Sequence, residues 1–186
     1  NEKFGVYVGN MYSKYQLGWS NSFTYKDFNL SFLINGKIGG KVISFTEAEL
    51  DKLGVSERTA NARLAAEADP SLVWNGKPAL YMPDGNLAPI SEYYQGIGGD
   101  VNATQYIYDA TNFRLRELSL GYTFRNLLGA SKHVSISFIA RNLFFIYKDA
   151  PVDPDISLST QNGLSAFEIF NMPSSRSFGF SLKANF

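Results

Sequence analysis

Few side chains in this sequence have the types and spacing that catalysis requires. His133 is the only histidine, and there is no cysteine to act as a nucleophile or as a thiolate metal ligand. His133 lies at a turn into a predicted strand, where a surface or interfacial residue is a better expectation than a general base. The sequence therefore predicts a protein that is not an enzyme and that uses no cofactor.

Three nearby carboxylates raise the question of a calcium site. Asp149, Asp153 and Asp155 supply the oxygen ligands that calcium prefers, but their spacing does not fit the EF-hand loop. Pro151 and Pro154 stand among them, and aspartates beside prolines commonly form turns. We expect no metal here, with calcium kept as an alternative.

Aromatic side chains in a polar setting suggest binding instead. Trp74, Tyr81, Tyr93 and Tyr94 stand among Asn, Asp and Gln in a long segment between predicted strands. Such residues can stack on sugar rings or contact a partner protein. The alternative is a small local core that packs this segment on itself.

The composition favours a sheet with one apolar and one polar face over the core of a compact soluble domain. The 186 residues include 15 Phe, 11 Tyr and 2 Trp, yet the mean hydropathy is slightly negative at −0.15. A β-barrel wall that is apolar outside and polar inside combines both properties. The 17 basic and 17 acidic residues cancel, which argues against nucleic acid as a partner.

Alternation of bulky and small residues predicts five long strands. In residues 15–25 the bulky side chains occupy nearly every odd position, and small or polar ones fill the even positions. The same pattern predicts further strands at 28–36, 112–124, 134–147 and 177–186. Phe113 and Leu115 fall out of phase, so we expect either a bulge near Arg114–Glu117 or the point where this strand leaves the membrane. Strands of this length suit a membrane crossing better than a sandwich, where about six residues is usual.

The connections between these strands alternate between short and long. Lys26–Asp27 and residues 125–132 are short turns, whereas residues 37–110 and 149–175 are long. Outer-membrane barrels have short periplasmic turns and long extracellular loops. We therefore expect an all-β, antiparallel transmembrane barrel segment of about five strands, with both long connections outside. A soluble or surface-attached β-sandwich that binds glycan or peptide remains the alternative.

Short helices are expected inside the first long connection. Thr46–Glu49 fits a capping box, and the helix that it opens should stop at Gly54. Residues 56–69 are rich in Ala, Arg and Glu and end before Pro70, which predicts a second helix.

The chain ends suggest a part of a longer exported protein. No stretch is apolar enough for a membrane helix, no signal peptide is visible, and there is no initiator Met. The final strand ends on Phe186, and an amphipathic last strand with a terminal aromatic is the assembly signal of outer-membrane barrels. We expect Phe186 to be that signal and to mark the true C-terminus.

Four ordered motifs resemble SusC/RagA-type TonB-dependent outer-membrane importers. They cover residues 15–31 (YQLGWSNSFTYKDFNLS), 113–122 (FRLRELSLGY), 140–144 (ARNLF) with 153–155 (DPD), and 173–180 (PSSRSFGF). The start of the second motif is one residue tighter than in the family. The resemblance covers most of the chain outside the first long connection.

This resemblance implies the C-terminal part of a large barrel with an internal plug. It implies localisation to the outer membrane and uptake of glycans or peptides in Bacteroidetes-like bacteria. The implied partners are the rest of the barrel and its plug, a SusD-like surface lipoprotein that lids it, and TonB through an upstream segment. In such a barrel Arg114, Arg116 and Arg141, which lie on inward phases, are expected to line the lumen or to pair with the plug.

Overall fold

The protein is mostly β-structure and divides into two compact units. The computed structural model describes residues 7–82, 84–98, 103–125, 133–156 and 164–185. The sheet unit comprises the described parts of Asn10–Lys41, Asp109–Ile156 and Met172–Phe186. The helical unit comprises those of Asn1–Gly9, Val42–Tyr108 and Ser157–Asn171. No helix in the described ranges is both long enough and apolar enough to cross a membrane.

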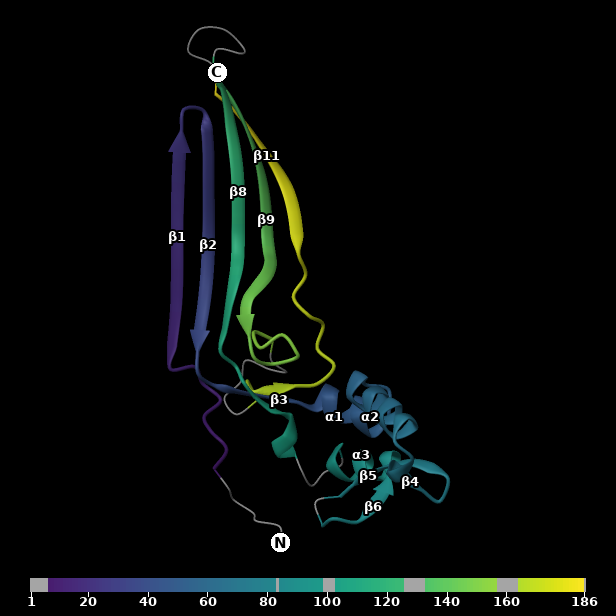
Figure 1. Ribbon diagram of the computed structural model, residues 1–186. Helices are drawn as coiled ribbons and strands as arrows, with labels where there is room; N and C mark the ends of the chain where they lie inside the picture. Colours follow the sequence, from purple (N-terminus) through teal and green to yellow (C-terminus); the bar gives the residue numbers. More distant parts are fainter. Residues whose placement is uncertain (1–6, 83, 99–102, 126–132, 157–163, 186) are drawn as a thin grey trace. The chain divides into compact units, whose positions relative to one another are not determined.

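Five long strands form the sheet unit and lie side by side in Figure 1. Their order is β1-β2-β8-β9-β11, and every neighbouring pair is antiparallel. The bounds are β1 Tyr15–Tyr25, β2 Phe28–Ile38, β8 Asn112–Arg125, β9 His133–Lys148 and β11 Ser177–Asn185. Every strand predicted from the alternation is confirmed to within two residues at each described end. Phe186 and the turn at 126–132 lie outside the described residues.

The strand register collects the bulky side chains on one face. Leu120 lies opposite Leu30 on one side and Phe138 on the other, and Phe138 lies opposite Phe180. These side chains pack against one another yet remain open to solvent: Leu120 is 51% exposed and Phe180 81%. The sheet unit therefore presents an apolar face that none of its own described segments covers.

The opposite face of the sheet is polar. Ser119 lies opposite Ser31, and Thr123 lies opposite Ser135, whose hydroxyl is 3.0 Å from the Thr123 hydroxyl. Because side chains alternate along a strand, this separation of the two faces follows directly from the sequence pattern. In the described ranges β1 and β11 have a strand partner on one side only.

A bulge at Arg116 changes the phase of β8. Glu117 pairs with Leu33, but the next pair joins Leu115 to Ile34, so Arg116 has no partner on β2. One extra residue reverses the side-chain alternation beyond it. The bulge predicted for this region is confirmed, and it returns Leu115 to the apolar face.

The helical unit contains three α-helices and two small sheets (Figure 1). One sheet has the order β10-β3-β7 and the other β4-β5-β6. The helices are α1 Phe45–Lys52, α2 Glu57–Ala68 and α3 Ile90–Gly98, with short 3-10 turns at Pro70–Leu72 and Ala103–Tyr106. The short strands are β3 Lys41–Ser44, β4 Val73–Trp74, β5 Lys77–Tyr81, β6 Leu87–Pro89, β7 Ile107–Asp109 and β10 Phe167–Glu168.

The first helix begins earlier than the predicted capping box. Its N-cap is Ser44, whose hydroxyl accepts a hydrogen bond from the Glu47 amide at 3.2 Å. The prediction that Thr46 opens the helix is therefore wrong by two residues. Thr46 instead donates a 2.7 Å hydrogen bond to the buried Glu168 carboxylate on β10, which also accepts one from Ser44. The second predicted helix is confirmed as α2, capped by Ser56.

The third helix was not expected, and it supplies most of the local core. Ile90, Tyr94 and Ile97 lie on one side of α3 and pack against Ala66 of α2. Leu72, Leu80 and Tyr93 complete this cluster from the surrounding segments. Residues three, four and seven apart share a helix face, so this spacing is the one that an amphipathic helix requires.

Candidate functional site

Two predicted lumen arginines lie together in a buried ion cluster of the sheet unit. Arg114 is 2% exposed, and one guanidinium nitrogen lies 2.6 Å from the Asp153 carboxylate. The guanidinium also lies over the Phe145 ring at 3.9 Å and 3.7 Å from Asp155. Arg116 projects from the bulge and reaches Asp155 at 3.4 Å.

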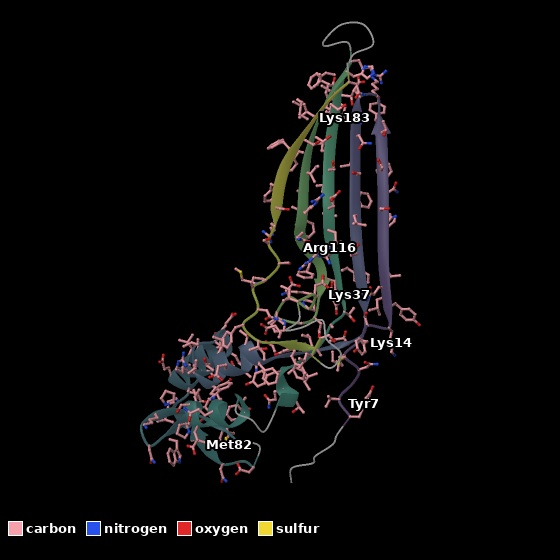
Figure 2. The ribbon with its side chains drawn as sticks, turned by 180° about the vertical axis from the view of Figure 1, so that it is seen from behind. Tyr7, Lys14, Lys37, Met82, Arg116 and Lys183 are labelled. Carbon is pink, nitrogen blue, oxygen red and sulfur yellow. The ribbon has the colours of Figure 1, made fainter. Side chains whose placement is uncertain are left out.

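This cluster joins four segments that are far apart in the sequence. Lys37 at the end of β2 lies 2.8 Å from Asp155, and Figure 2 labels Lys37 and Arg116 toward the same end of the sheet. Ser174, just before β11, donates a 2.6 Å hydrogen bond from its hydroxyl to Asp153. The segment that carries the two aspartates is thereby tied to β2, β8 and the approach to β11.

The third predicted arginine lies outside this cluster. Arg141 is opposite Glu117 in the register and forms a 2.8 Å ion pair with it, with 61% of its side chain exposed. Arg114 and Arg141 both belong to the polar face of the sheet, opposite Asn35 and Ser177 respectively. Their role as lumen residues remains a prediction.

The candidate calcium ligands have other partners. Asp153 and Asp155 face the cations described above, and Asp149 accepts a hydrogen bond from the Asp109 amide at 3.2 Å. Within the described ranges, no group of three His, Cys, Asp or Glu side chains is arranged to hold a metal ion. Asp153 and Asp155 thus belong to a salt-bridge network, whereas Asp149 accepts a backbone hydrogen bond.

The Asp153 carboxylate should make stability depend on pH in acid. Burial alone would raise its pKa, but hydrogen bonds from Ser174 and Arg114 together lower the pKa of Asp153 below its ordinary 3.8. A lowered folded-state pKa stabilises the fold above about pH 4, and this stabilisation is lost as the pH falls through the folded value.

We therefore expect the free energy of unfolding to fall less steeply between about pH 4 and 2 in Asp153→Asn than in the native protein. Urea unfolding at a series of pH values measures the two slopes. Equal slopes in both proteins would contradict this linkage, whatever the absolute loss of stability in the variant.

A second buried network holds the helical unit together. The Asp51 carboxylate on α1 is fully buried and accepts hydrogen bonds from Ser56, Arg58 at 3.1 Å and Tyr106 at 3.0 Å. Arg58 also lies 2.7 Å from Glu47, which accepts a short hydrogen bond from Tyr108.

The same contacts shift the ionisation of the two phenols. Burial and the neighbouring Asp51 carboxylate raise the pKa of Tyr106. Burial and the hydrogen bond to Glu47 raise the pKa of Tyr108 to about 12. Burial alone would lower the pKa of Arg58, but its contacts with Tyr108, Asp51 and Glu47 together raise that pKa above its ordinary value. Both tyrosines therefore stay neutral and act as hydrogen-bond donors, a structural role.

Removing the central carboxylate should loosen the helical unit. Asp51→Ala leaves the buried Tyr106 hydroxyl and one side of Arg58 without an acceptor, which costs about 2 kcal/mol in the free energy of unfolding. Hydrogen exchange of the α1 and α2 amides measures this change. Glu49→Ala, which removes only a half-exposed pair with Lys52 at 3.4 Å, is the matched control and should have little effect.

The four predicted aromatic contact residues take different positions in the helical unit. Tyr94 is 6% exposed and lines a cavity of about 330 Å³, and Tyr93 packs edge-on against it at 5.1 Å. Trp74 on β4 and Tyr81 on β5 are open to solvent, at 43% and 60%. The local-core alternative therefore applies to Tyr93 and Tyr94, whereas Trp74 and Tyr81 remain available for contact. Phe186, the predicted assembly signal, lies outside the described residues.

The long-stranded antiparallel sheet, with one apolar and one polar face, is the feature to compare with known proteins. The sequence matches no protein-family model and no curated protein. Among solved structures, the RagAB peptide importer in the "open-open" state matches over 92% of this chain, with a TM-score of 0.59 and 18% identity. The "closed-closed" state matches over 95%, with a TM-score of 0.60 and 17% identity. The matched region is 17% of the other chain in both cases. At this identity the likeness establishes a shared fold.

Proposed function

We propose that this chain is the C-terminal part of a transmembrane β-barrel in a larger outer-membrane nutrient importer. The observation that carries the proposal is the five-stranded antiparallel sheet, which is apolar and exposed on one face, polar on the other, and paired on one side only at β1 and β11. Such a sheet suits a wall between lipid and a water-filled lumen, with its edges joined to the rest of the barrel.

Strand length and side-chain type support a membrane setting. The strands run from 9 residues in β11 to 16 in β9, and a tilted membrane strand needs about 9–11. Tyr15 and Tyr25, at the two ends of β1, are 64% and 70% exposed, as expected for aromatic residues at a lipid interface. In this arrangement the short β1–β2 turn is periplasmic and the helical unit is extracellular.

The transport role rests on the family resemblance together with the shared fold. The motifs resemble SusC/RagA-type importers, and the solved structures with a similar fold are those of a peptide importer. We propose uptake of glycans or peptides, with a SusD-like surface lipoprotein as the lid and TonB acting through upstream parts of the barrel protein and its plug. The chain performs no enzymatic step in this proposal.

The ion cluster refines the roles of the predicted lumen arginines. Arg114 is buried against Asp153 and Phe145, so we assign it to holding the Asp149–Asp155 segment rather than to an open channel surface. Arg141 is exposed on the polar face and is the better candidate for contact with solute or plug.

Fractionation of the native source tests the proposal. We expect this sequence in the detergent-extracted outer membrane, within a polypeptide several times longer by intact-mass analysis. Recovery as a free soluble chain would contradict the barrel and favour the β-sandwich alternative. That alternative needs a second sheet over the apolar face, and the described strands of the sheet unit form one sheet only.

A further inference from the structure

The helical unit contains a cavity that has no part in the proposed barrel wall. It has a volume of about 330 Å³ and lies between the end of α1, the middle of α2, the start of β5 and the first turns of α3. Pro78, Pro89, Ile90 and the Tyr94 ring form its apolar lining. Small-molecule sites have about this size and this mostly apolar surface, with a few polar groups that orient the ligand.

In this cavity the negative charge has partners, whereas two of the positive charges have no anionic partner among the described residues. Asp51 contributes the only carboxylate among its lining residues, and that carboxylate is occupied by Arg58, Ser56 and Tyr106. Three cations also line the cavity: Lys52, Arg63 and Lys77. Lys52 pairs with Glu49 at 3.4 Å, whereas neither Arg63 nor Lys77 forms an ion pair with a described residue.

Arg63 has a neutral hydrogen-bond partner, so its positive charge is not balanced by an anion. One guanidinium nitrogen donates a 3.0 Å hydrogen bond to the Gly54 carbonyl, which orients the side chain without neutralising it. Lys77 is exposed at the start of β5. A guanidinium and an ammonium beside an aromatic wall favour an anionic ligand, and the planar fork of Arg suits a carboxylate.

We propose that this cavity binds a carboxylate-bearing small ligand, either the C-terminal end of a short peptide or an acidic sugar. Arg63 and Lys77 pair with the carboxylate, while Tyr94 and Ile90 contact the carbon skeleton. The inference deepens the proposed function, on which it rests for its biological setting, because it names acidic solutes as the class taken up. Binding itself does not require transport.

Calorimetry on the intact protein in detergent tests the proposal with two matched pairs of probes. Trialanine is compared with its C-terminal amide, and glucuronate with glucose, so that peptide and sugar sources are distinguished. We expect at least one acid to bind, with its neutral counterpart at least tenfold weaker. Lys77→Gln should weaken that acid about fivefold and Arg63→Gln about tenfold. Lys26→Gln, in the exposed β1–β2 turn, is the control and should leave the affinity unchanged.

Lys77→Gln is the decisive variant because its exposed side chain contributes little to folding. Unchanged affinity of the acid in Lys77→Gln, equal binding of acid and neutral probes, or no binding of any probe would overturn the proposal. Those results would leave the barrel assignment intact, because fractionation tests that assignment separately.

Discussion

Arg114→Ala is expected to lower the free energy of unfolding by about 3–5 kcal/mol, the largest effect of any single change considered for this chain. The substitution removes the cation that faces Asp153 at 2.6 Å and Asp155 at 3.7 Å, while both carboxylates remain less than 10% exposed. Asp155 keeps Lys37 and Arg116 as partners, but Asp153 is left without a cation among the described residues. An uncompensated buried charge is far more costly than the loss of an exposed pair. The stacking of the guanidinium on Phe145 is lost as well.

Urea unfolding of the intact protein in detergent measures this loss, and proteolysis of the 149–156 segment reports where it acts. We expect faster cleavage of that segment in the variant, because Arg114 is its main connection to β8. Arg141→Ala is the matched control. Its pair with Glu117 has side-chain exposures of 61% and 37%, so it should contribute at most about 1 kcal/mol. Equal losses in the two variants would show that the cluster is no more important than a surface ion pair.

Leu120→Arg is expected to prevent assembly into the membrane or to cost about 2–4 kcal/mol if assembly occurs. Leu120 lies in the middle of the apolar face, between Leu30 and Phe138 on the neighbouring strands, and is 51% exposed. If this face meets lipid, a guanidinium at this depth must enter hydrocarbon. The amount of folded protein in the outer membrane, measured by the heat-dependent shift of the band in gel electrophoresis, gives the result.

Ser119→Arg provides the opposite-face control one residue away. Ser119 lies on the polar face, opposite Ser31 and Ile139, where a charged side chain would extend into a water-filled lumen. We expect near-native assembly of Ser119→Arg and a strong defect for Leu120→Arg. The reverse order, or equal tolerance of both, would contradict the assignment of the apolar face to lipid.

The long strands were predictable because their signal is local. Alternation along residues 15–25 or 177–185 is a property of one segment, and the pleat converts it directly into two faces. The bulge at Arg116 was readable for the same reason, since the side-chain phase changes within β8 itself.

Errors arose where two local signals competed. Ser44 and Thr46 each precede a glutamate by three residues, which is the spacing of a capping box. In the structure Ser44 caps the helix, because Thr46 donates its hydrogen bond to Glu168, a residue distant in the sequence. Helix α3 was missed although Ile90, Tyr93, Tyr94 and Ile97 have helical spacing, because the glycines and tyrosines around them favoured an irregular loop.

The sequence by itself determined the amphipathic strands, the β1–β2 turn and the presence of the first two helices, because each depends on residues close together in the chain. Tertiary structure alone decided which charged side chains form ion pairs: Arg114 is buried against Asp153, whereas Arg141 is exposed and pairs with Glu117. It also decided that Arg63, Lys77 and Tyr94 share one cavity. Contacts between distant segments depend on strand register and loop path, and no periodicity within one segment encodes them.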